Sequence, residues 1–310
     1  MDISNFYQTE LWGQVEEFAT IWPVDVLDAF VDCHDELHLG ILLLLIQETA
    51  NQAYIHRARP EEHGFSSTMR WYLAWNCLRN LRLPRRNERI KFITWVNDVE
   101  RVIFSRDTVV VDAEGRCIIA VNAGWFIIDR ATKRPVPASG LSSMFPIARP
   151  NPPLWRPMRQ RLRFQMDALR PADWDLPKSV LAQPGNCHRT IPRENRPVYF
   201  SEIDRNGHMN NTAYGNRIAD RFDNVKGTNG RVTGIDISYL SEAVHGTQIS
   251  TYGEVLELSP RTEITPVDVM GSLPVDRVAL LFGEKREPAT NADESPGEAC
   301  FRSRVLLTKA

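Results

Sequence analysis

This sequence has no long apolar run, no leader-like first segment and no paired cysteines, and each absence excludes a class of protein. The longest aliphatic run, Ile41 to Ile46, is far shorter than the roughly 18 residues that a membrane-spanning helix needs, so no membrane span is expected. The opening residues MDISNFYQTE contain neither a basic nor an apolar stretch, so we expect no secretory signal.

The cysteines and the missing motifs narrow the chemistry further. The five cysteines are widely spaced, odd in number and absent from any C-x-x-C pair, which favours reduced thiols in the cytoplasm over disulfides or a cysteine zinc site. The plastid stroma is the alternative compartment, if a plant transit peptide has been trimmed away. G-x-S-x-G, P-loop and G-x-G-x-x-G motifs are missing, so we expect no serine hydrolase elbow, no nucleotide site and no cofactor.

The amino-acid composition is that of an ordinary globular chain of 310 residues, with 43% hydrophobic and 25% charged residues. This length suits one large domain or two domains of ordinary size. The formal net charge of −2 and the lack of a base-reading motif argue against nucleic-acid binding.

Prolines are concentrated between Pro146 and Pro197, at a density that interrupts regular strand ladders and long helices. We therefore predict three parts, which are an N-terminal domain over 1–145, a proline-rich connecting segment over 146–197 and a C-terminal domain over 198–310.

The same order of elements occurs on both sides of this segment, namely a polar turn, a helix and several strand-like runs. Helices are predicted over 39–57 and 212–222, and a strand over 198–203 leads into the second turn. The turn Asp32–Leu37 aligns with Asp204–Met209 at an offset of 172 positions (204 minus 32), with apolar and acidic residues in matching places. Helices followed by antiparallel strands, used twice, predict a duplicated α+β fold.

The most informative segment runs from Asp204 to Tyr214 and has the pattern D-x-N-x-H-x-N-N-x-x-Y. Gly207 permits a sharp turn, and Asn210 or Asn211 can cap the helix that follows. A carboxylate, a carboxamide and an imidazole are thus gathered at a helix N-terminus, where a developing negative charge is stabilised. The plainer alternative is an Asx-turn followed by a helix cap.

This segment resembles the signature of the acyl-acyl-carrier-protein thioesterase family of plants and bacteria. Tyr239–Ala243 is similar to the family's Y-x-x-E-C strand, and Leu45–Ala50 resembles its first helix. The resemblance implies an α+β tandem hotdog fold, each hotdog an antiparallel sheet wrapped around a long central helix. It also implies hydrolysis of fatty acyl-carrier thioesters to free fatty acids in fatty acid biosynthesis, with the acyl pocket on the side of the N-terminal domain.

By this resemblance the catalytic residues are Asp204, Asn206, His208 and Glu242. Glu242 would activate water or attack directly, Asn206 would position the water or the carbonyl, and His208 would stabilise the oxyanion or protonate the departing thiol. Asp204 would orient Asn206 and His208. An older scheme for the family places a cysteine after the glutamate, where this chain has Ala243, so a cysteine nucleophile there is not required.

The resemblance also implies residues that hold the substrate and its carrier. The substrate-binding residues would be Asn210, Asn211 and Tyr214. The family's partner is a strongly acidic acyl carrier protein with a phosphopantetheine arm, and basic side chains crowd the segment Arg79–Lys91. We expect docking at Arg82, Arg85, Arg86 and Arg89. A solvated basic face is the plainer alternative, and a homodimer is one option for the oligomeric state.

Several rival functions remain open on sequence alone. An acyl-CoA thioesterase would use the same residues, whereas a non-catalytic acyl-carrier binding module or a degenerate copy would keep only the fold. A hotdog dehydratase would carry D-x-N-x-x-H, but Met209 occupies that last place and the histidine comes one residue early. His34 and His38 form an H-x-x-x-H pair, but no third ligand at suitable spacing accompanies them, so no metal is expected.

Overall fold

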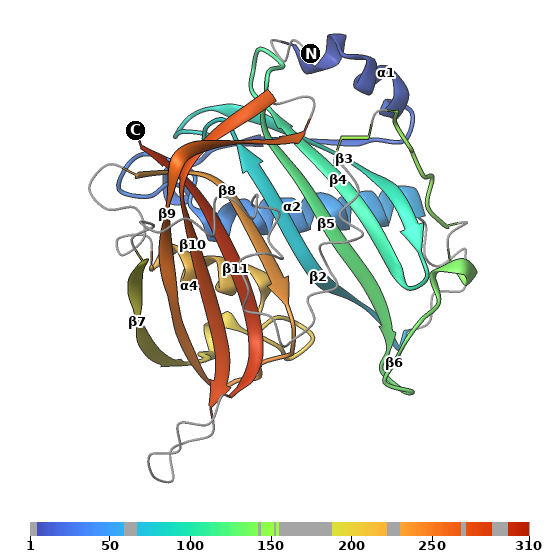
Figure 1. The fold of residues 1–310 in the computed structure, drawn as a ribbon. Helices are drawn as coiled ribbons and strands as arrows, with labels where there is room; N and C mark the ends of the chain where they lie inside the picture. Colours follow the sequence, from blue (N-terminus) through green and yellow to red (C-terminus); the bar gives the residue numbers. More distant parts are fainter. Residues whose placement is uncertain are drawn as a thin grey trace.

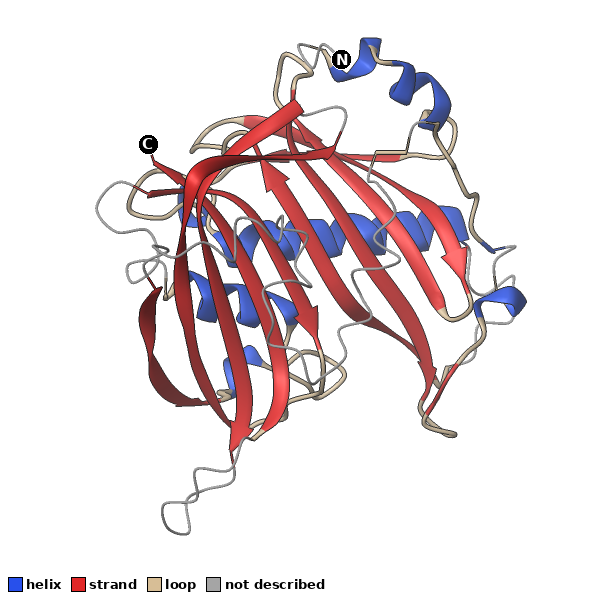
Figure 2. Cartoon of the chain, viewed as in Figure 1, coloured by secondary structure: helices blue, strands red, loops and turns tan. Residues whose placement is uncertain are grey.

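The computed structural model describes residues 5–58, 67–141, 144–151, 153–154, 188–221, 230–267, 271–286 and 297–309. One continuous sheet of eleven antiparallel strands lies across two helices (Figure 1; Figure 2). The strands are β1 (Thr20–Asp25), β2 (Met69–Asn80), β3 (Arg89–Glu100), β4 (Ile103–Val111), β5 (Cys117–Asp129), β6 (Arg134–Pro135), β7 (His188–Pro197), β8 (Gly230–Tyr239), β9 (Gln248–Val267), β10 (Gly271–Arg286) and β11 (Glu298–Lys309). The α-helices are α1 (Glu10–Val15), α2 (Leu39–Ala53) and α4 (Asn211–Ala219). The short helical turns are η1 (Phe6–Gln8), η2 (Asp28–Phe30), η3 (Tyr54–Ala58), η5 (Ala138–Gly140) and η9 (Phe200–Glu202).

The order of strands repeats on either side of one seam. The sheet runs β1-β3-β4-β5-β2-β8-β11-β10-β9-β7, so the antiparallel pair β2–β8 joins two halves. Read outward from that seam, the first half has the order 2-5-4-3-1 and the second half the matching order 8-11-10-9-7. Two curved sheets, each with its own helix and joined edge to edge, form a tandem hotdog, which confirms the predicted fold class.

The aligned turns have the same hydrogen bonds at the predicted offset. The Asp32 Oδ1 accepts from the backbone amides two and four residues on, at 2.8 and 3.2 Å, and the Asp204 Oδ1 does the same at 2.7 and 3.2 Å. The residue before the turn closes has a left-handed φ in both copies, 65° at Asp35 and 85° at Gly207. Only glycine adopts this conformation without steric cost, although aspartate tolerates it. The repeat predicted from sequence is therefore present at atomic detail.

The two helices cross at glycines. A Cβ on Gly40 of α2 would lie 1.9 Å from the Asn216 Oδ1, and a Cβ on Gly215 of α4 would lie 2.5 Å from the Leu43 Cδ1. A larger residue at either place would push the helices apart. Helix α2 has 15 residues, whereas α4 has 9, so the predicted long central helix is present in the first half only.

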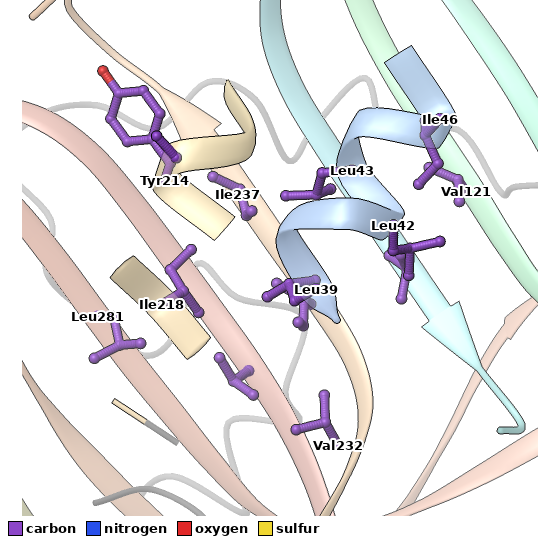
Figure 3. Close-up of a cluster of buried hydrophobic side chains, with 14 of the residues drawn as sticks. Leu39, Leu42, Leu43, Ile46, Val121, Tyr214, Ile218, Val232, Ile237 and Leu281 are labelled. Carbon is purple, nitrogen blue, oxygen red and sulfur yellow. The ribbon is translucent and has the colours of Figure 1, made fainter. Parts of the chain in front are cut away.

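The hydrophobic core is shared by the two halves. Apolar side chains of α2 recur at the three- and four-residue spacing of a buried helical face. They meet side chains of α4 and of strands from both halves, including Leu39, Leu42, Leu43, Ile46, Val121, Tyr214, Ile218, Val232, Ile237 and Leu281 (Figure 3). Because one core crosses the seam, the halves support each other.

A buried ion network also crosses the seam. The Arg79 Nη1 on β2 lies 2.6 Å from the Asp236 Oδ1 on β8, and the Arg304 Nε on β11 lies 2.7 Å from the Asp236 Oδ2. Burial by itself would raise the pKa of the Asp236 carboxyl, but Arg304 and Arg79 hold it far below its ordinary value. The carboxylate thus compensates two buried guanidinium groups, one from each half.

Two sequence expectations differ from the structure. The predicted connecting segment ends in strand β7, which pairs with β9 and so belongs to the second half. Prolines 192 and 197 are tolerated because β7 is an edge strand. The predicted strand over 198–203 is instead the turn η9, which leads directly into the Asp204 turn. Positions 155–187 and 222 lie outside the described residues, and so do their predicted structures.

Candidate active site

The turn before α4 is held to the segment after β8 through the backbone. The Met209 amide donates to the Ala243 carbonyl at 2.7 Å, and Ile203 and Met209 form an isolated β-bridge across the turn. Glu242 precedes Ala243, whose side chain is buried. This backbone contact sets the glutamate beside a turn that lies 34 residues earlier in the chain (242 minus 208).

The predicted meeting of imidazole and carboxylate is present. The His208 Nε2 lies 3.1 Å from the Glu242 Oε2, with the side chains 22% and 50% exposed. A carboxylate only accepts hydrogen bonds, so any hydrogen bond between these two groups would use the His208 Nε2 as the donor. The glutamate therefore stands at the boundary between the protein and solvent, where a water molecule can reach it.

A tyrosine from the first half completes this group. The Tyr72 hydroxyl, on β2, donates a hydrogen bond to Glu242, and its ring centroid lies 6.0 Å from that of His208. Burial, and then the negative charge of Glu242, raise the pKa of Tyr72, so the hydroxyl keeps its proton. Nothing in the sequence assigns Tyr72 to the active site. Because it belongs to no motif, only the register of β2 could have identified it.

The amide of Asn206 has a defined orientation. Its Nδ2 lies 3.3 Å from the Asp204 Oδ2, and a carboxylate requires a donor at that place. The Oδ1 is then the atom left over, and it is buried without a hydrogen-bond partner among the described residues. Asp204 thus orients the Asn206 side chain directly, whereas its hydrogen bonds with His208 are to the backbone of that residue, from its amide and to its carbonyl.

The three predicted substrate-binding residues have different surroundings. Asn210 caps α4, where its Oδ1 accepts from the Thr212 amide at 3.0 Å, and it is not among the described residues that line the cavity. Asn211 does line the cavity, and both of its polar side-chain atoms lack a partner in the described chain. Tyr214 also lines it, with its hydroxyl 3.4 Å from the Cys300 sulfur.

The buried cysteines of the described chain are poor nucleophiles. Cys300 lies closest to the site and is buried, and burial raises the pKa of its thiol. Cys77 and Cys117 are buried too, with thiol pKa values raised by the same cause, and Cys33 is exposed in the turn of the first half. A thiolate is the reactive form, so burial of this kind disfavours covalent catalysis. Cys187 lies outside the described residues.

A cavity of about 600 Å³ opens at the candidate site and extends into the first half. Asp204, Asn206, His208 and Glu242 line one part of it. Aromatic and aliphatic side chains of the first half line much of the rest, among them Tyr54, Trp71, Val96, Phe104, Trp125 and Phe145. A mainly apolar cavity with a few convergent polar groups is the usual form of a small-molecule site.

The corresponding place in the first half has no such chemistry. There the Leu37 amide donates to the Pro84 carbonyl at 2.8 Å, as Met209 does to Ala243, so Leu83 occupies the place of Glu242. His38, one member of the H-x-x-x-H pair, caps α2 by accepting from the Gly40 amide. Among the described residues no cluster of three histidine, cysteine or acidic side chains could hold a metal ion.

The predicted docking arginines lie far from Glu242. They follow the C-terminal end of β2, whereas Tyr72 lies near its start. The eight residue steps from Tyr72 to Asn80 span roughly 25 Å. Most of them are paired with acids, through the contacts Arg82–Glu88, Arg82–Asp112, Arg86–Asp28, Arg86–Asp35 and Arg89–Asp25. Arg85 is exposed and forms no ion pair within the described chain.

Other arginines lie much nearer the cavity mouth. Arg70 and Arg205 line the cavity, and Arg205 is exposed within the Asp204 turn. Arg130 is exposed and lies close enough to Tyr72 for its charge to oppose the rise in that hydroxyl's pKa. These three residues form a basic rim next to the candidate site.

Family profiles match both halves of the chain. The family profile described as acyl-ACP thioesterase N-terminal domain matches residues 16–139, and the profile described as acyl-ACP thioesterase C-terminal domain matches residues 188–270. No curated protein sequence matches the chain. No helix within the described ranges is long and apolar enough to cross a membrane.

Solved structures give the same result for the fold. An acyl-ACP thioesterase from Bacteroides thetaiotaomicron superposes with a TM-score of 0.64 and 19% identity, covering 94% of this chain and 99% of the other. A 12:0-ACP thioesterase from Umbellularia californica gives 0.63 and 10% identity, covering 94% and 98%. At these identities the likeness establishes the shared fold.

Proposed function

The chain belongs to the acyl-ACP thioesterase family and is a thioester hydrolase, and from this premise we propose that it hydrolyses fatty acyl-ACP to free fatty acid and holo-ACP. The observation that carries the proposal is the His208–Glu242 pair at the mouth of an apolar cavity. Thiol release from fatty acyl-ACP, compared with release from the matching acyl-CoA at rising salt, tests it. Equal rates on both carriers at every salt concentration would favour an acyl-CoA thioesterase.

In this proposal Glu242 acts as a general base toward water. The unpaired Asn206 Oδ1 is an acceptor and suits one hydrogen of that water, which leaves the other for the Glu242 carboxylate. The water oxygen bonds to the thioester carbon, and its proton passes to Glu242. The carbon–sulfur bond then breaks, and the proton passes from Glu242 to the departing sulfur, which restores the carboxylate. A thiol with a pKa of about 8.5 leaves readily, so water delivery and oxyanion stabilisation dominate the barrier.

The remaining groups hold this arrangement in place. Tyr72 donates a hydrogen bond to Glu242, and the His208 Nε2 lies 3.1 Å from the same carboxylate, so both groups help to orient it. The turn directly precedes α4, so the positive dipole end of the helix adds stabilisation for the oxyanion. The acyl chain would occupy the apolar part of the cavity in the first half.

Replacing Tyr72 by Phe is expected to lower kcat about 10-fold with little change in KM, because it removes one hydrogen bond to a charged group that acts in catalysis and not in binding. Steady-state thiol release on one acyl-ACP measures both constants. Tyr252→Phe is the matched control, because Tyr252 also bonds to a glutamate, Glu284, away from the cavity. Equal kcat for Tyr72→Phe and wild type would remove Tyr72 from the mechanism.

We propose that the carrier protein docks on the basic rim. The prediction from the sequence was docking at the arginines that follow β2. Arg130→Glu with Arg205→Glu should raise KM for acyl-ACP roughly 10-fold and flatten its salt dependence. Hydrolysis of an acyl-pantetheine, which lacks the carrier protein, should change much less. Arg85→Glu with Arg86→Glu is tested in parallel. A larger effect of this second pair would place the docking surface at the end of β2 instead.

A further inference from the structure

One buried cation in the cavity is left without a carboxylate partner. Arg106 lies on β4, is 8% exposed and lines the same cavity as Glu242. Phe104, two residues before it on the same strand, also lines the cavity, as the alternation of side chains along a strand requires. The guanidinium therefore faces the space proposed to hold the acyl chain.

The hydrogen bonds around Arg106 leave most of its donors unused. Its Nη1 lies 3.3 Å from the Thr94 Oγ1, the sole hydrogen bond found for this side chain among the described residues. The Thr94 hydroxyl already donates to the Asp107 carbonyl and accepts from Thr108 at 2.9 Å. A hydroxyl has one donor and two acceptor positions, so Thr94 has no further capacity. A guanidinium offers five N–H donors, and the others have no acceptor in the described chain.

The other buried arginines of the described chain each have an acidic partner, so Arg106 is an exception. Arg79 and Arg304 share Asp236, Arg217 pairs with Glu202 at 2.9 Å, and Arg221 pairs with a glutamate of β7. Asp107, the neighbour of Arg106, points to the opposite face of the sheet, where its Oδ1 accepts from an asparagine of β5. Within the described ranges, Arg106 is thus the buried arginine without an acid.

The charge on Arg106 persists in spite of this environment. Burial lowers its pKa to about 10, and no neighbouring carboxylate opposes that effect, so the side chain is a cation at neutral pH. An unpaired buried charge is costly, and a methyl-ended acyl chain would displace water from it without replacing the lost hydrogen bonds. A carboxylate would satisfy both the charge and the planar pair of donors.

We propose that Arg106 binds a carboxylate at the far end of the acyl chain, so that the cavity accepts ω-carboxyacyl thioesters. The inference rests on the proposed thioesterase function and names the substrate class of that site. The product is then a dicarboxylic acid, formed by the same attack of water and the same loss of the carrier thiol.

The sheet register gives the reach that such a chain needs. Tyr72 and Ile103 both pair with Phe126, so Arg106 stands two strands across and three residues along from Tyr72. With strands about 4.8 Å apart and about 3.3 Å per residue, the two Cα atoms are roughly 14 Å apart. A chain of intermediate length spans this distance, which makes decanedioyl-ACP and decanoyl-ACP the natural pair to compare.

The decisive measurement is kcat/KM on decanedioyl-ACP and decanoyl-ACP for wild type and Arg106→Met. Wild type should prefer the carboxyl-ended chain, and the variant should lose at least about 10-fold on that substrate, the scale of one charged hydrogen bond. On decanoyl-ACP the variant should be equal to wild type or faster. Arg106→Lys should recover part of the loss, because it restores the charge without the paired donors.

Two results would overturn the proposal. One is an equal loss on both substrates in Arg106→Met, which would make Arg106 a structural residue. The other is a wild-type preference for decanoyl-ACP, which would make the cation a limit on chain length. Phe104→Leu is the matched control for a general change of the cavity wall, and it should alter both rates by a similar factor.

Product binding separates this proposal from the thioesterase proposal. Decanedioic acid should raise the melting temperature of wild type more than decanoic acid does, and the difference should vanish in Arg106→Met. The melting temperature of the unliganded variant shows whether it folds. Stabilisation by the diacid without thiol release from any thioester would support the Arg106 site and reject the hydrolase function. Thiol release without a stronger stabilisation by the diacid would support the hydrolase function and reject the Arg106 site.

Discussion

Replacing Glu242 by Gln is expected to lower kcat for acyl-ACP hydrolysis by at least about 100-fold, the scale typical of removing a general base. The amide keeps the size of the side chain but cannot accept the proton of the attacking water. The contact of its remaining oxygen with the His208 Nε2, 3.1 Å in wild type, can persist. The measurement is thiol release under saturating substrate, with KM determined on the same preparation.

The repeat in the fold supplies a stringent control for this variant. Glu36 lies in the corresponding turn of the first half, whose backbone hydrogen bonds match those of the Asp204 turn. Glu36→Gln should leave kcat near the wild-type value. The first half has Leu83 in the position equivalent to Glu242, so its turn has no carboxylate there to act as a base. If Glu242→Gln turned over at the wild-type rate with its fold intact, the base would have to be another group.

Replacing Asp236 by Asn is expected to lower the free energy of unfolding by about 3–5 kcal/mol, because it removes the buried negative charge that two buried guanidinium groups share. Asp236 is 15% exposed, and its partners Arg79 and Arg304 are 1% and 6% exposed, so solvent screens the network little. The network crosses the β2–β8 seam, and its loss should weaken the junction of the two halves. Urea unfolding followed by fluorescence and circular dichroism measures the change.

The same carboxyl predicts how stability depends on pH. The folded state holds the pKa of Asp236 below its value of about 3.9 in an unfolded chain. Its contribution is therefore complete above that unfolded value and is lost as the pH falls toward the folded one. Acidification below pH of about 4 should destabilise wild type more than Asp236→Asn, so the difference between the two should shrink.

An exposed pair provides the comparison for this prediction. Glu114 and Arg116 lie 2.8 Å apart but are 64% and 53% exposed. Glu114→Gln should change the unfolding free energy by less than about 1 kcal/mol, because water screens such pairs. Equal stability of Asp236→Asn and wild type at neutral pH would show that the seam does not depend on the network.

The parts of the fold that were predictable depend on residues close together in the chain. An aspartate that binds the amides two and four residues on, followed by a helix cap, needs only its own neighbours, and both copies have it. The starts of α2 and α4 follow from those turns. Strand β7 was missed because prolines 192 and 197 suggest an irregular segment, and only its place at the sheet edge permits them.

The site residues differ in the same way, because some depend on neighbours in the chain and others on strand pairing. Asp204, Asn206 and His208 lie within one turn, so their pattern identifies them, and the resemblance added Glu242. Tyr72 carries no such signal, because its contact with Glu242 depends on how β2 pairs with β8.

The chain alone thus determined the duplication, the class of fold and the polar groups of one turn, because these depend on local hydrogen bonds and on periodicity. Only the folded molecule decided which of the two turns faces a carboxylate, which tyrosine supports it and where a buried arginine enters the cavity. Those features depend on strand register, in which a shift of one residue turns every side chain to the opposite face of the sheet.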